Sequence, residues 1–536
     1  MNIKNIVKKH IAFIILFIII ATYMGVKTFP ENGWDGWFGS SQVYMGAKYW
    51  ANDGIIAHKF LLLPMGYSKV VKYLDDPSLR HHTRGTKTGG LVGNRLYYTH
   101  YPNSYITPYA TLMNAGVYDR HWHRLLALSF SMLGFLLFYF FLVIAFSPGV
   151  AFLGSFYYGV STMFLDYADT LSNQSFDDLW RFAILFLSVV AVRFEKNHRK
   201  YLIFNTLIWF SFFILSISSY DSTLFVFVWL VGLDAVVFKK ILWKKWLFFA
   251  SAPALGFILQ MFQNWWYLGN WKDVWLDAFG ASTAKMQTSS ILSHCWSVMR
   301  TFYLATGLKV LWANIIIFSL FFSFWKIKGK SINKSMFLAV ALLVAGSAYS
   351  FVFVGSGGFP YQGRQLMPFV GLVVGMSTVF LFTKFKNEKK WDSLSVLAVI
   401  LLVLLWFGQF YRTTRYVSEW PNNVIDSKVI ELGAYLNLLA KNNAIIFNIE
   451  NFDNTNENYP QPDIFLEYYA GVPILNFKKI EDLIRDYKKL KTISIYGFNS
   501  IIMADSMEKI KEIGVILSNQ LDIVFLNDKF ISLIKE

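Results

Sequence analysis

A lone carboxylate flanked by tryptophans stands early in the chain, in Gly33-Trp34-Asp35-Gly36-Trp37. An acidic group between two Trp rings is partly desolvated, and desolvation makes a carboxylate a better base. Asp35 is therefore a candidate general base. The alternative interpretation is an ordinary loop aspartate that caps the next helix, with the aromatic residues forming an interfacial belt.

Two further carboxylates, Asp166 and Asp169, lie three residues apart where a helix is expected to end. The spacing i, i+3 places both on one helix face, where they suit a hard divalent cation such as Mg²⁺ or Mn²⁺, or a cluster of polar hydroxyls. Asp177 and Asp178 follow and are expected to cap the next helix. A solvated helix end would explain the same residues, so the sequence leaves metal dependence open.

A cationic candidate, Arg364, stands in the stretch Gln362-Gly363-Arg364-Gln365 before a late apolar run. A planar guanidinium is well shaped for bidentate binding of phosphate. It could instead be a membrane anchor whose charged tip reaches the lipid headgroups.

Four histidines invite a zinc prediction, but a cationic loop near phosphates explains them as well: His81, His82, His121 and His123.

The elements that must position these residues are apolar helices. The chain is 55% hydrophobic, 19% aromatic and only 16% charged, which is more apolar surface than one soluble core can bury. Nearly uncharged runs of about 18 residues or more recur, and each can cross about 30 Å of hydrocarbon as a helix. We expect about eleven transmembrane helices, at 11–28, 124–146, 150–165, 180–194, 201–218, 222–238, 246–263, 304–325, 336–354, 366–383 and 392–410.

Charge indicates the orientation of these spans. Lys and Arg gather in the segments 1–10, 193–200, 239–245, 326–334 and 384–390, whereas the short segments on the other side hold only Arg181, Lys272, Lys285, Arg300 and Arg364. Because cytoplasmic loops carry an excess of Lys and Arg, we expect a cytoplasmic N-terminus. An odd number of spans then places the chain after residue 411 outside.

Two expected outer segments are large. Residues 29–123 form the first outer loop, which has the half-apolar composition of helices that lie along the interface. Residues 421–536 change character: charged helical patterns at 427–441 and 480–490 alternate with strand-like runs at 444–449, 492–496 and 523–526. This alternation predicts a soluble α/β domain that follows a transmembrane domain of residues 1–410.

Other classes of protein fit less well. The net charge of +16 could suggest nucleic-acid binding, but the basic residues form short clusters between apolar runs, which suits anionic lipid headgroups. A single cysteine, Cys295, excludes a disulfide framework within the chain.

Taken together, the chain resembles the C-type superfamily of integral-membrane glycosyltransferases, in particular the branch of protein mannosyltransferases and lipid A aminoarabinose transferases. The resemblance covers roughly residues 11–410 and rests on the order of its parts: Asp35 in a long first outer loop, the stretch 97–105, Arg124 opening the second span, an acidic second outer loop, and Arg364 with Pro368 before a late span. Family members commonly have Asp-Glu at the position of Asp35-Gly36 and two prolines at that of Pro102-Asn103.

The resemblance implies that Asp35 is the catalytic base and that Asp166 or Asp169 is the acidic residue of the second loop. It also implies that His100 and Arg364 lie near the donor phosphate. The implied reaction transfers a sugar from a polyprenyl-phosphate donor to a hydroxyl of a glycan, lipid or protein at the outer face of the cell membrane. A transporter or flippase of lipid-linked saccharide is the rival, but it should carry ionisable residues within its spans, and few appear. A noncatalytic scaffold would not need so many helices.

Overall fold

The computed structural model describes residues 3–29, 38–62, 99, 101–239, 242–286, 290–308, 310–327, 334–354, 360–387 and 393–419, with short helical pieces and five strands within 433–534. The chain folds as two compact units, which are described in turn. The first comprises Met1–Glu31, Tyr101–Tyr105 and Asp119–Asn422; the second comprises Asn32–His100, Ile106–Tyr118 and Asn423–Glu536.

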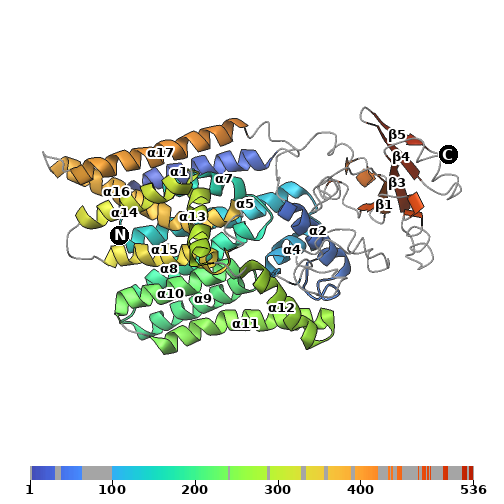
Figure 1. Ribbon diagram of the computed structural model, residues 1–536, viewed down its shortest axis with the longest axis horizontal. Coiled ribbons are helices and arrows are strands. Elements are labelled where there is room, and N and C mark those ends of the chain that lie inside the picture. Colours follow the sequence, from blue (N-terminus) through green and yellow to red (C-terminus); the bar gives the residue numbers. More distant parts are fainter. Residues whose placement is uncertain are drawn as a thin grey trace. The chain divides into compact units, whose positions relative to one another are not determined.

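The first unit consists of helices, most of which lie side by side (Figure 1). In chain order they are α1 (Ile3–Thr28), α5 (Arg120–Ala145), α6 (Pro148–Gly159), α7 (Thr162–Tyr167), α8 (Asn173–Arg193), α9 (His198–Ser216), α10 (Tyr220–Phe238), α11 (Trp243–Leu268), α12 (Trp271–Met286), α13 (Ile291–Thr306), α14 (Val310–Ile327), α15 (Lys334–Val352), η5 (Pro360–Gln362), α16 (Gly363–Asn387) and α17 (Ser393–Glu419).

Seven helices within the described residues are long and apolar enough to cross a membrane: α1 from His10, α5, α10, α11, α15 from Ser335, α16 to Phe385, and α17. Large apolar side chains on α1 point outward, such as Ile18 at 57% and Ile19 at 61% exposure. Such exposure suits contact with lipid rather than water. The protein is a multi-pass integral membrane protein, and the expected number of about eleven spans stays a prediction.

The expected single span 150–165 is wrong, because the chain breaks after α6. The twelve residues of α6 reach about 18 Å, well short of a bilayer. At Gly159 a side chain would collide with Ile20 and Phe135, and Ser161 is extended, with its hydroxyl accepting a hydrogen bond from the Phe164 amide to cap α7. The packing at Gly159 and the cap at Ser161 therefore divide one continuous apolar stretch into two helices, α6 and α7.

The expected span 304–325 also begins too early. Gly307 adopts a left-handed conformation, with φ of +69°, and ends α13. Glycine tolerates this conformation without a steric penalty, so it is a common helix stop. The apolar run thus belongs to two helices, α13 and α14.

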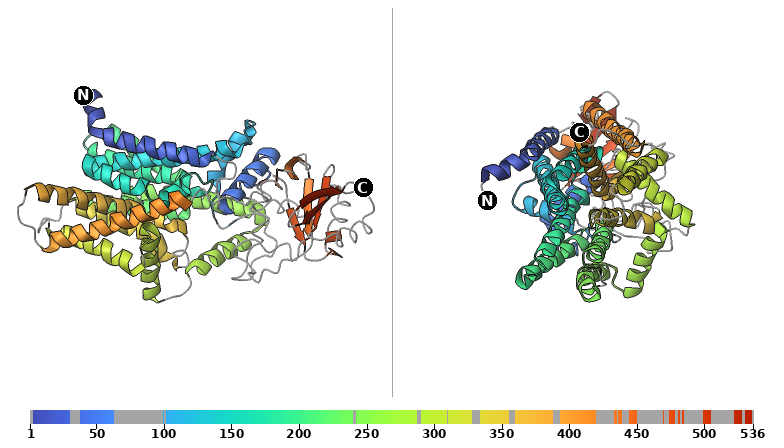
Figure 2. Two further views of the ribbon diagram at one scale, coloured as in Figure 1. Left: turned by 90° about the horizontal axis from the view of Figure 1, so that it is seen from above. Right: turned by 90° about the vertical axis from the view of Figure 1, so that its left-hand side faces the viewer.

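Glycines bring α6 and α16 into backbone contact. A Cβ at Gly154 would lie 2.9 Å from the carbonyl oxygen of Gly371, and one at Gly375 would lie 2.6 Å from the carbonyl oxygen of Val150. Small residues allow this approach in membrane helices. The end-on view of Figure 2 shows that these helices form a bundle. Within it, α16 also contacts α13, α14 and α15. The contact fixes the spacing of the two helices that carry Tyr158 and Arg364.

The second unit contains α2 (Phe38–Asp53), η3 at its border (Ser104–Ile106) and α4 (Thr107–Asn114), of which α2 and α4 pack together. It also contains a sheet of β1 (Ala444–Ile449), β2 (Ile474–Phe477), β3 (Asn499–Ala504), β4 (Asp522–Asn527) and β5 (Phe530–Ile534), in the order β2-β1-β3-β4-β5. All pairs are parallel except β4 with β5. The expected strands at 444–449 and 523–526 correspond to β1 and β4, whereas 492–496 lies outside the described residues. The domain bounds 1–410 and 421–536 stay predictions.

Candidate functional site

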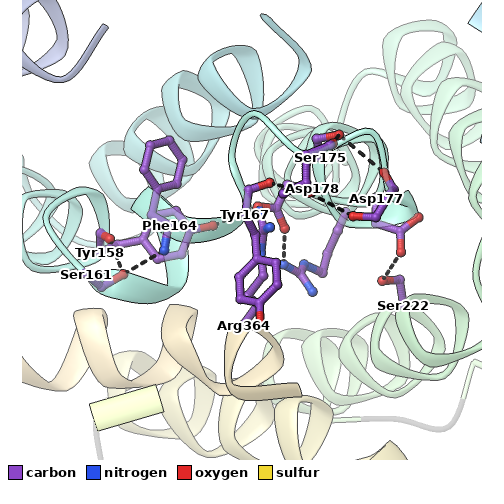
Figure 3. Close-up of polar contacts among 12 residues, drawn as sticks. Tyr158, Ser161, Phe164, Tyr167, Ser175, Asp177, Asp178, Ser222 and Arg364 are labelled. Carbon is purple, nitrogen blue, oxygen red and sulfur yellow. Dashed lines mark hydrogen bonds and ion pairs between the residues drawn. The ribbon is translucent and has the colours of Figure 1, made fainter. Parts of the chain in front are cut away.

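A buried ion cluster occupies the end of the first unit where α8 and α16 begin (Figure 3). The two oxygens of Asp178 accept hydrogen bonds from Arg181 and from Arg364. Tyr158 of α6 also donates to Asp178 Oδ2, at 2.9 Å. Arg181 and Arg364 are 1% and 2% exposed, so this arrangement excludes a lipid-facing anchor role for Arg364.

The backbone explains how Arg364 reaches this position. A Cβ at Gly363 would lie 2.7 Å from the amide nitrogen of Ala305, so only glycine allows the first turn of α16 to approach α13 this closely. The Arg364 guanidinium lies 5.7 Å from the centre of the Tyr167 ring. Because α8 and α16 both begin here, the positive ends of two helix dipoles add to the two guanidinium charges.

Several N–H groups of this cluster are left unused. Nε and Nη1 of Arg364 and Nε of Arg181 are buried and have no hydrogen-bond partner within the described part of the chain. A buried donor without a partner costs about 1–3 kcal/mol, and more on a charged group. The site therefore has spare hydrogen-bond donors beside a positive charge, which is the chemistry that binds an oxyanion.

Hydroxyls and carboxamides extend the cluster to α10. Tyr101 donates to Asp221 at 2.6 Å, and Gln362 and Gln365 donate to the other oxygen of Asp221 at 3.4 and 3.3 Å. Gln365 also accepts from Arg181 at 2.7 Å, which joins this group to the ion cluster. Burial and the negative charge of Asp221 raise the pKa of Tyr101 well above its ordinary value, so the phenol stays protonated and donates.

A neighbouring ion triad joins α1 and α5 to the loop after α7. One oxygen of Asp169 accepts from Lys27 at 2.8 Å and the other from Arg124, and all three residues are at most 3% exposed. Burial alone would raise the pKa of Asp169, but the two cations and their hydrogen bonds outweigh it and lower the pKa. Asp169 therefore holds the last turn of α1 as an ionised carboxylate.

The expected divalent-cation site at Asp166 and Asp169 does not match this geometry. Both oxygens of Asp169 are already bound to cations, and Asp166 accepts a long hydrogen bond, 3.5 Å, from Tyr416 of α17. Burial raises the pKa of Asp166, which weakens it further as a ligand. Across the described ranges, no group of three His, Cys, Asp or Glu side chains could hold a metal ion. These two carboxylates as placed do not fit Mg²⁺ or Mn²⁺.

The other expected site residues are located only in part. Asp35, His100, His81 and His82 lie outside the described residues. The His121 ring Nδ1 lies 3.2 Å from the carbonyl oxygen of Thr28, and His123 is fully buried on α5. The roles of Asp35 and His100 therefore stay predictions.

Sequence reasoning missed several members of the site: Lys27, Tyr101, Asp221 and Gln365. It treated Arg181 only as a charge in an outer loop. A usable signal was present, since Lys27 lies at the end of one expected span and Asp221 directly before another. Charged residues at successive span ends on the same side must gather at one end of a helical bundle.

No protein-family model and no curated protein matches the sequence. Among solved structures, the chain is similar to ArnT from Cupriavidus metallidurans in the apo state, with a TM-score of 0.53 and 10% identity over 96% of this chain and 92% of that one. A second ArnT structure, bound to undecaprenyl phosphate, has a TM-score of 0.51 and 9% identity over 96% of this chain and 93% of that one. An oligosaccharyltransferase from Archaeoglobus fulgidus has a TM-score of 0.45 and 11% identity over 86% of this chain and 62% of that one.

The likeness to ArnT extends over nearly the whole of both chains, so this chain shares the overall fold of ArnT. The resemblance expected from the order of Asp35, Arg124 and Arg364 is confirmed at the level of the fold. At this sequence identity the likeness concerns architecture, and the reaction has to be argued from the site.

Proposed function

We propose that the chain transfers a sugar from a polyprenyl-phosphate donor to an acceptor hydroxyl at the extracytoplasmic face of the cell membrane, with inversion at the anomeric carbon. The observation that carries this proposal is Arg364, a fully buried guanidinium at a junction of helix N-termini whose Nε and Nη1 atoms have no hydrogen-bond partner among the described residues. A lipid phosphate supplies the acceptor oxygens that these donors lack. An ArnT structure with the same fold is bound to undecaprenyl phosphate, which is a ligand of this class.

The chemistry follows from where such a donor must lie. A polyprenyl-phosphate sugar stays in the bilayer, so its anomeric carbon is presented near the membrane surface. The acceptor hydroxyl attacks that carbon, the bond to the phosphate oxygen breaks, and the lipid phosphate leaves with the electron pair. Arg364, with His100 as a second phosphate-binding group, stabilises the charge that develops on the phosphate. Asp35 takes the proton from the acceptor hydroxyl.

The topology completes the proposal. The N-terminus is cytoplasmic, the site end of the bundle faces the opposite side, and residues 421–536 form an extracytoplasmic α/β domain. A glycan, a lipid or a protein would all supply a suitable hydroxyl.

A transporter or flippase of lipid-linked saccharide is the rival function. It would place ionisable groups along a pathway through the middle of the membrane. Several buried charges instead lie near helix ends: Lys27, Arg124 and Arg364 at the end where α8 and α16 begin, and Asp234, paired with Lys245 at 2.7 Å, at the other. This distribution favours chemistry at one membrane surface.

Binding of undecaprenyl phosphate to Arg364 variants tests the proposal. Arg364→Ala should weaken binding by about tenfold or more, since charge-assisted hydrogen bonds contribute about 1.5–3 kcal/mol. Arg364→Lys should weaken it less, because the charge remains while the bidentate geometry is lost. Arg415→Ala is the matched control, since Arg415 is 63% exposed and pairs with Glu419 on its own helix.

Removing one partner of a buried ion pair can destabilise a protein by about 3–5 kcal/mol, so each affinity must be measured on monodisperse protein with a cooperative unfolding transition. Unchanged affinity in both Arg364 variants would remove the phosphate from this site.

A further inference from the structure

A second guanidinium, Arg412 of α17, also has an unused donor at the site end of the bundle. Its Nη1 atom is buried without a hydrogen-bond partner within the described residues. The side chain packs directly on Gly307, where a Cβ would collide with Nη1. The next residue, Thr413, donates to the carbonyl oxygen of Val160 at 2.6 Å, which places this part of α17 beside the break between α6 and α7.

Tyr157 of α6 packs against the helix that carries Arg412. Its ring centre lies 5.2 Å from that of Trp406 of α17. Its side chain is fully buried, and its hydroxyl has no hydrogen-bond partner in the described part of the chain. The adjacent Tyr158 donates instead to Asp178. Consecutive tyrosines of α6 therefore lie against two different parts of the bundle, Tyr158 at the Arg364 cluster and Tyr157 at α17.

Arg412 and Tyr157 both offer hydrogen-bond donors that have no partner within the described residues. Tyr303 of α13, the helix that ends at Gly307, is 42% exposed. Asp166 accepts a hydrogen bond from Tyr416 of α17 at 3.5 Å. A positive charge with phenol and guanidinium donors matches an oxyanion that has several acceptor oxygens.

The surroundings indicate that this anion belongs to a lipid. Large apolar side chains directly before Arg412 are exposed: Phe407 at 69%, Phe410 at 46% and Tyr411 at 60%. They lie on α17, which is long and apolar enough to span the membrane. Acyl or isoprenoid chains that cover these residues would carry a headgroup to the level of Arg412.

We propose that Arg412 and Tyr157 bind a phosphate group carried by a membrane lipid, at a site distinct from Arg364. The phosphate has two sources of the same chemistry: the headgroup of an anionic phospholipid, or the second phosphate of a polyprenyl diphosphate. The site does not depend on sugar transfer, so it can be tested whether or not the chain is a transferase.

Native mass spectrometry of delipidated protein in detergent tests both sources. One arm compares phosphatidylglycerol with phosphatidylcholine, and the other compares undecaprenyl diphosphate with undecaprenyl phosphate. Arg412→Gln should weaken binding of the preferred lipid by about tenfold. Tyr157→Phe removes one hydroxyl and should weaken it by a smaller factor. Arg415→Gln, one turn further along the same helix, should bind as the unmodified protein does.

The result in each arm decides the proposal. A preference for phosphatidylglycerol that requires Arg412 and Tyr157 assigns the site to phospholipid headgroups, and a similar preference for undecaprenyl diphosphate over undecaprenyl phosphate assigns it to the second phosphate of a polyprenyl diphosphate. If neither preference changes in Arg412→Gln and Tyr157→Phe, the proposal is overturned. Should Arg412→Gln fail to fold, Tyr157→Phe and Arg412→Lys decide, since Tyr157→Phe keeps the ring that packs in the core.

Discussion

Arg364 and Asp178 are separated by 186 residues in the chain, yet they form an ion pair in which each side chain is only 2% exposed. Asp178 is shared with Arg181, so two guanidinium groups meet one carboxylate and the three carry a net positive charge. Asp221, which is also buried, is joined to this group through Gln365 and offsets part of that charge, while Nε and Nη1 of Arg364 have no hydrogen-bond partner within the described residues. The ion pair thus connects the fold of the protein to the class of ligand that it is proposed to bind.

Asp35→Asn should lower the rate of sugar transfer by about 10²-fold or more, in the range for loss of a general base. The substitution keeps the shape of the side chain and removes its basic oxygen. Affinity for the lipid donor should barely change, because the proposed role of Asp35 is to deprotonate the acceptor. The transfer rate and the donor affinity are measured on one preparation. Asp53→Asn is the control, since Asp53 is a partly exposed carboxylate at the end of α2 that pairs with His58. Near-normal turnover in Asp35→Asn would contradict the proposed mechanism.

Asp169→Asn should reduce the free energy of unfolding at pH 7 by about 3–5 kcal/mol, because Lys27 and Arg124 lose their shared partner. Its folded-state pKa lies below that of the unfolded chain, so the stabilisation is present above pH of about 4 and is lost as the pH falls through the folded-state value. Thermal unfolding in detergent between pH 7 and pH 3 should therefore show a smaller acid-induced loss in Asp169→Asn than in the unmodified protein. Asp119→Asn, at the exposed cap of α5, is the control. Parallel pH curves for Asp169→Asn and the unmodified protein would show that the triad contributes nothing to acid sensitivity.

Manganese binding should not depend on Asp166 or Asp169. Both oxygens of Asp169 are bound by cationic side chains, so neither is available to a metal ion. Electron paramagnetic resonance of free Mn²⁺, titrated with purified protein, gives the number and affinity of bound ions. Loss of a stoichiometric Mn²⁺ in Asp166→Asn or Asp169→Asn would restore the metal site expected from the sequence.

A reporter fused after residue 536 should be extracytoplasmic, and one inserted within 384–390 should be cytoplasmic, because Lys and Arg mark the inner side. Accessibility to a membrane-impermeant label distinguishes the two positions. The reverse pattern would place the Arg364 site on the cytoplasmic side and contradict the proposed reaction at the outer face.

The helices were largely predictable from the sequence because an apolar run long enough to cross a bilayer leaves a clear pattern in hydropathy. The expectation failed at 150–165 and at 304–325, where the determinants are Ser161 and Gly307. Ser161 caps a helix with its side chain, and Gly307 ends a helix in a left-handed conformation. Neither residue changes the apolar character of the stretch in which it lies, so hydropathy does not reveal the break.

The candidate site was less predictable, since residue type shows a charge but not its partner. Asp178 was expected to cap a helix, and its role as the partner of Arg364 depends on a contact between distant parts of the chain. Asp169 looked like half of a metal site because its spacing from Asp166 is favourable. The triad appears only when Lys27 and Arg124 are brought in by α1 and α5.

The glycine contact between α6 and α16 has a consequence for how the site tolerates change. Where two backbones touch, even one added methyl group must push the helices apart, because no side chain is present to yield. Tyr158 is carried by one helix and Arg364 by the other, so a displacement at Gly154 or Gly371 would be transmitted to the distance between them. These two positions therefore set the distance between the two side chains. A substitution at either position would alter ligand recognition without changing any residue that is proposed to contact the ligand.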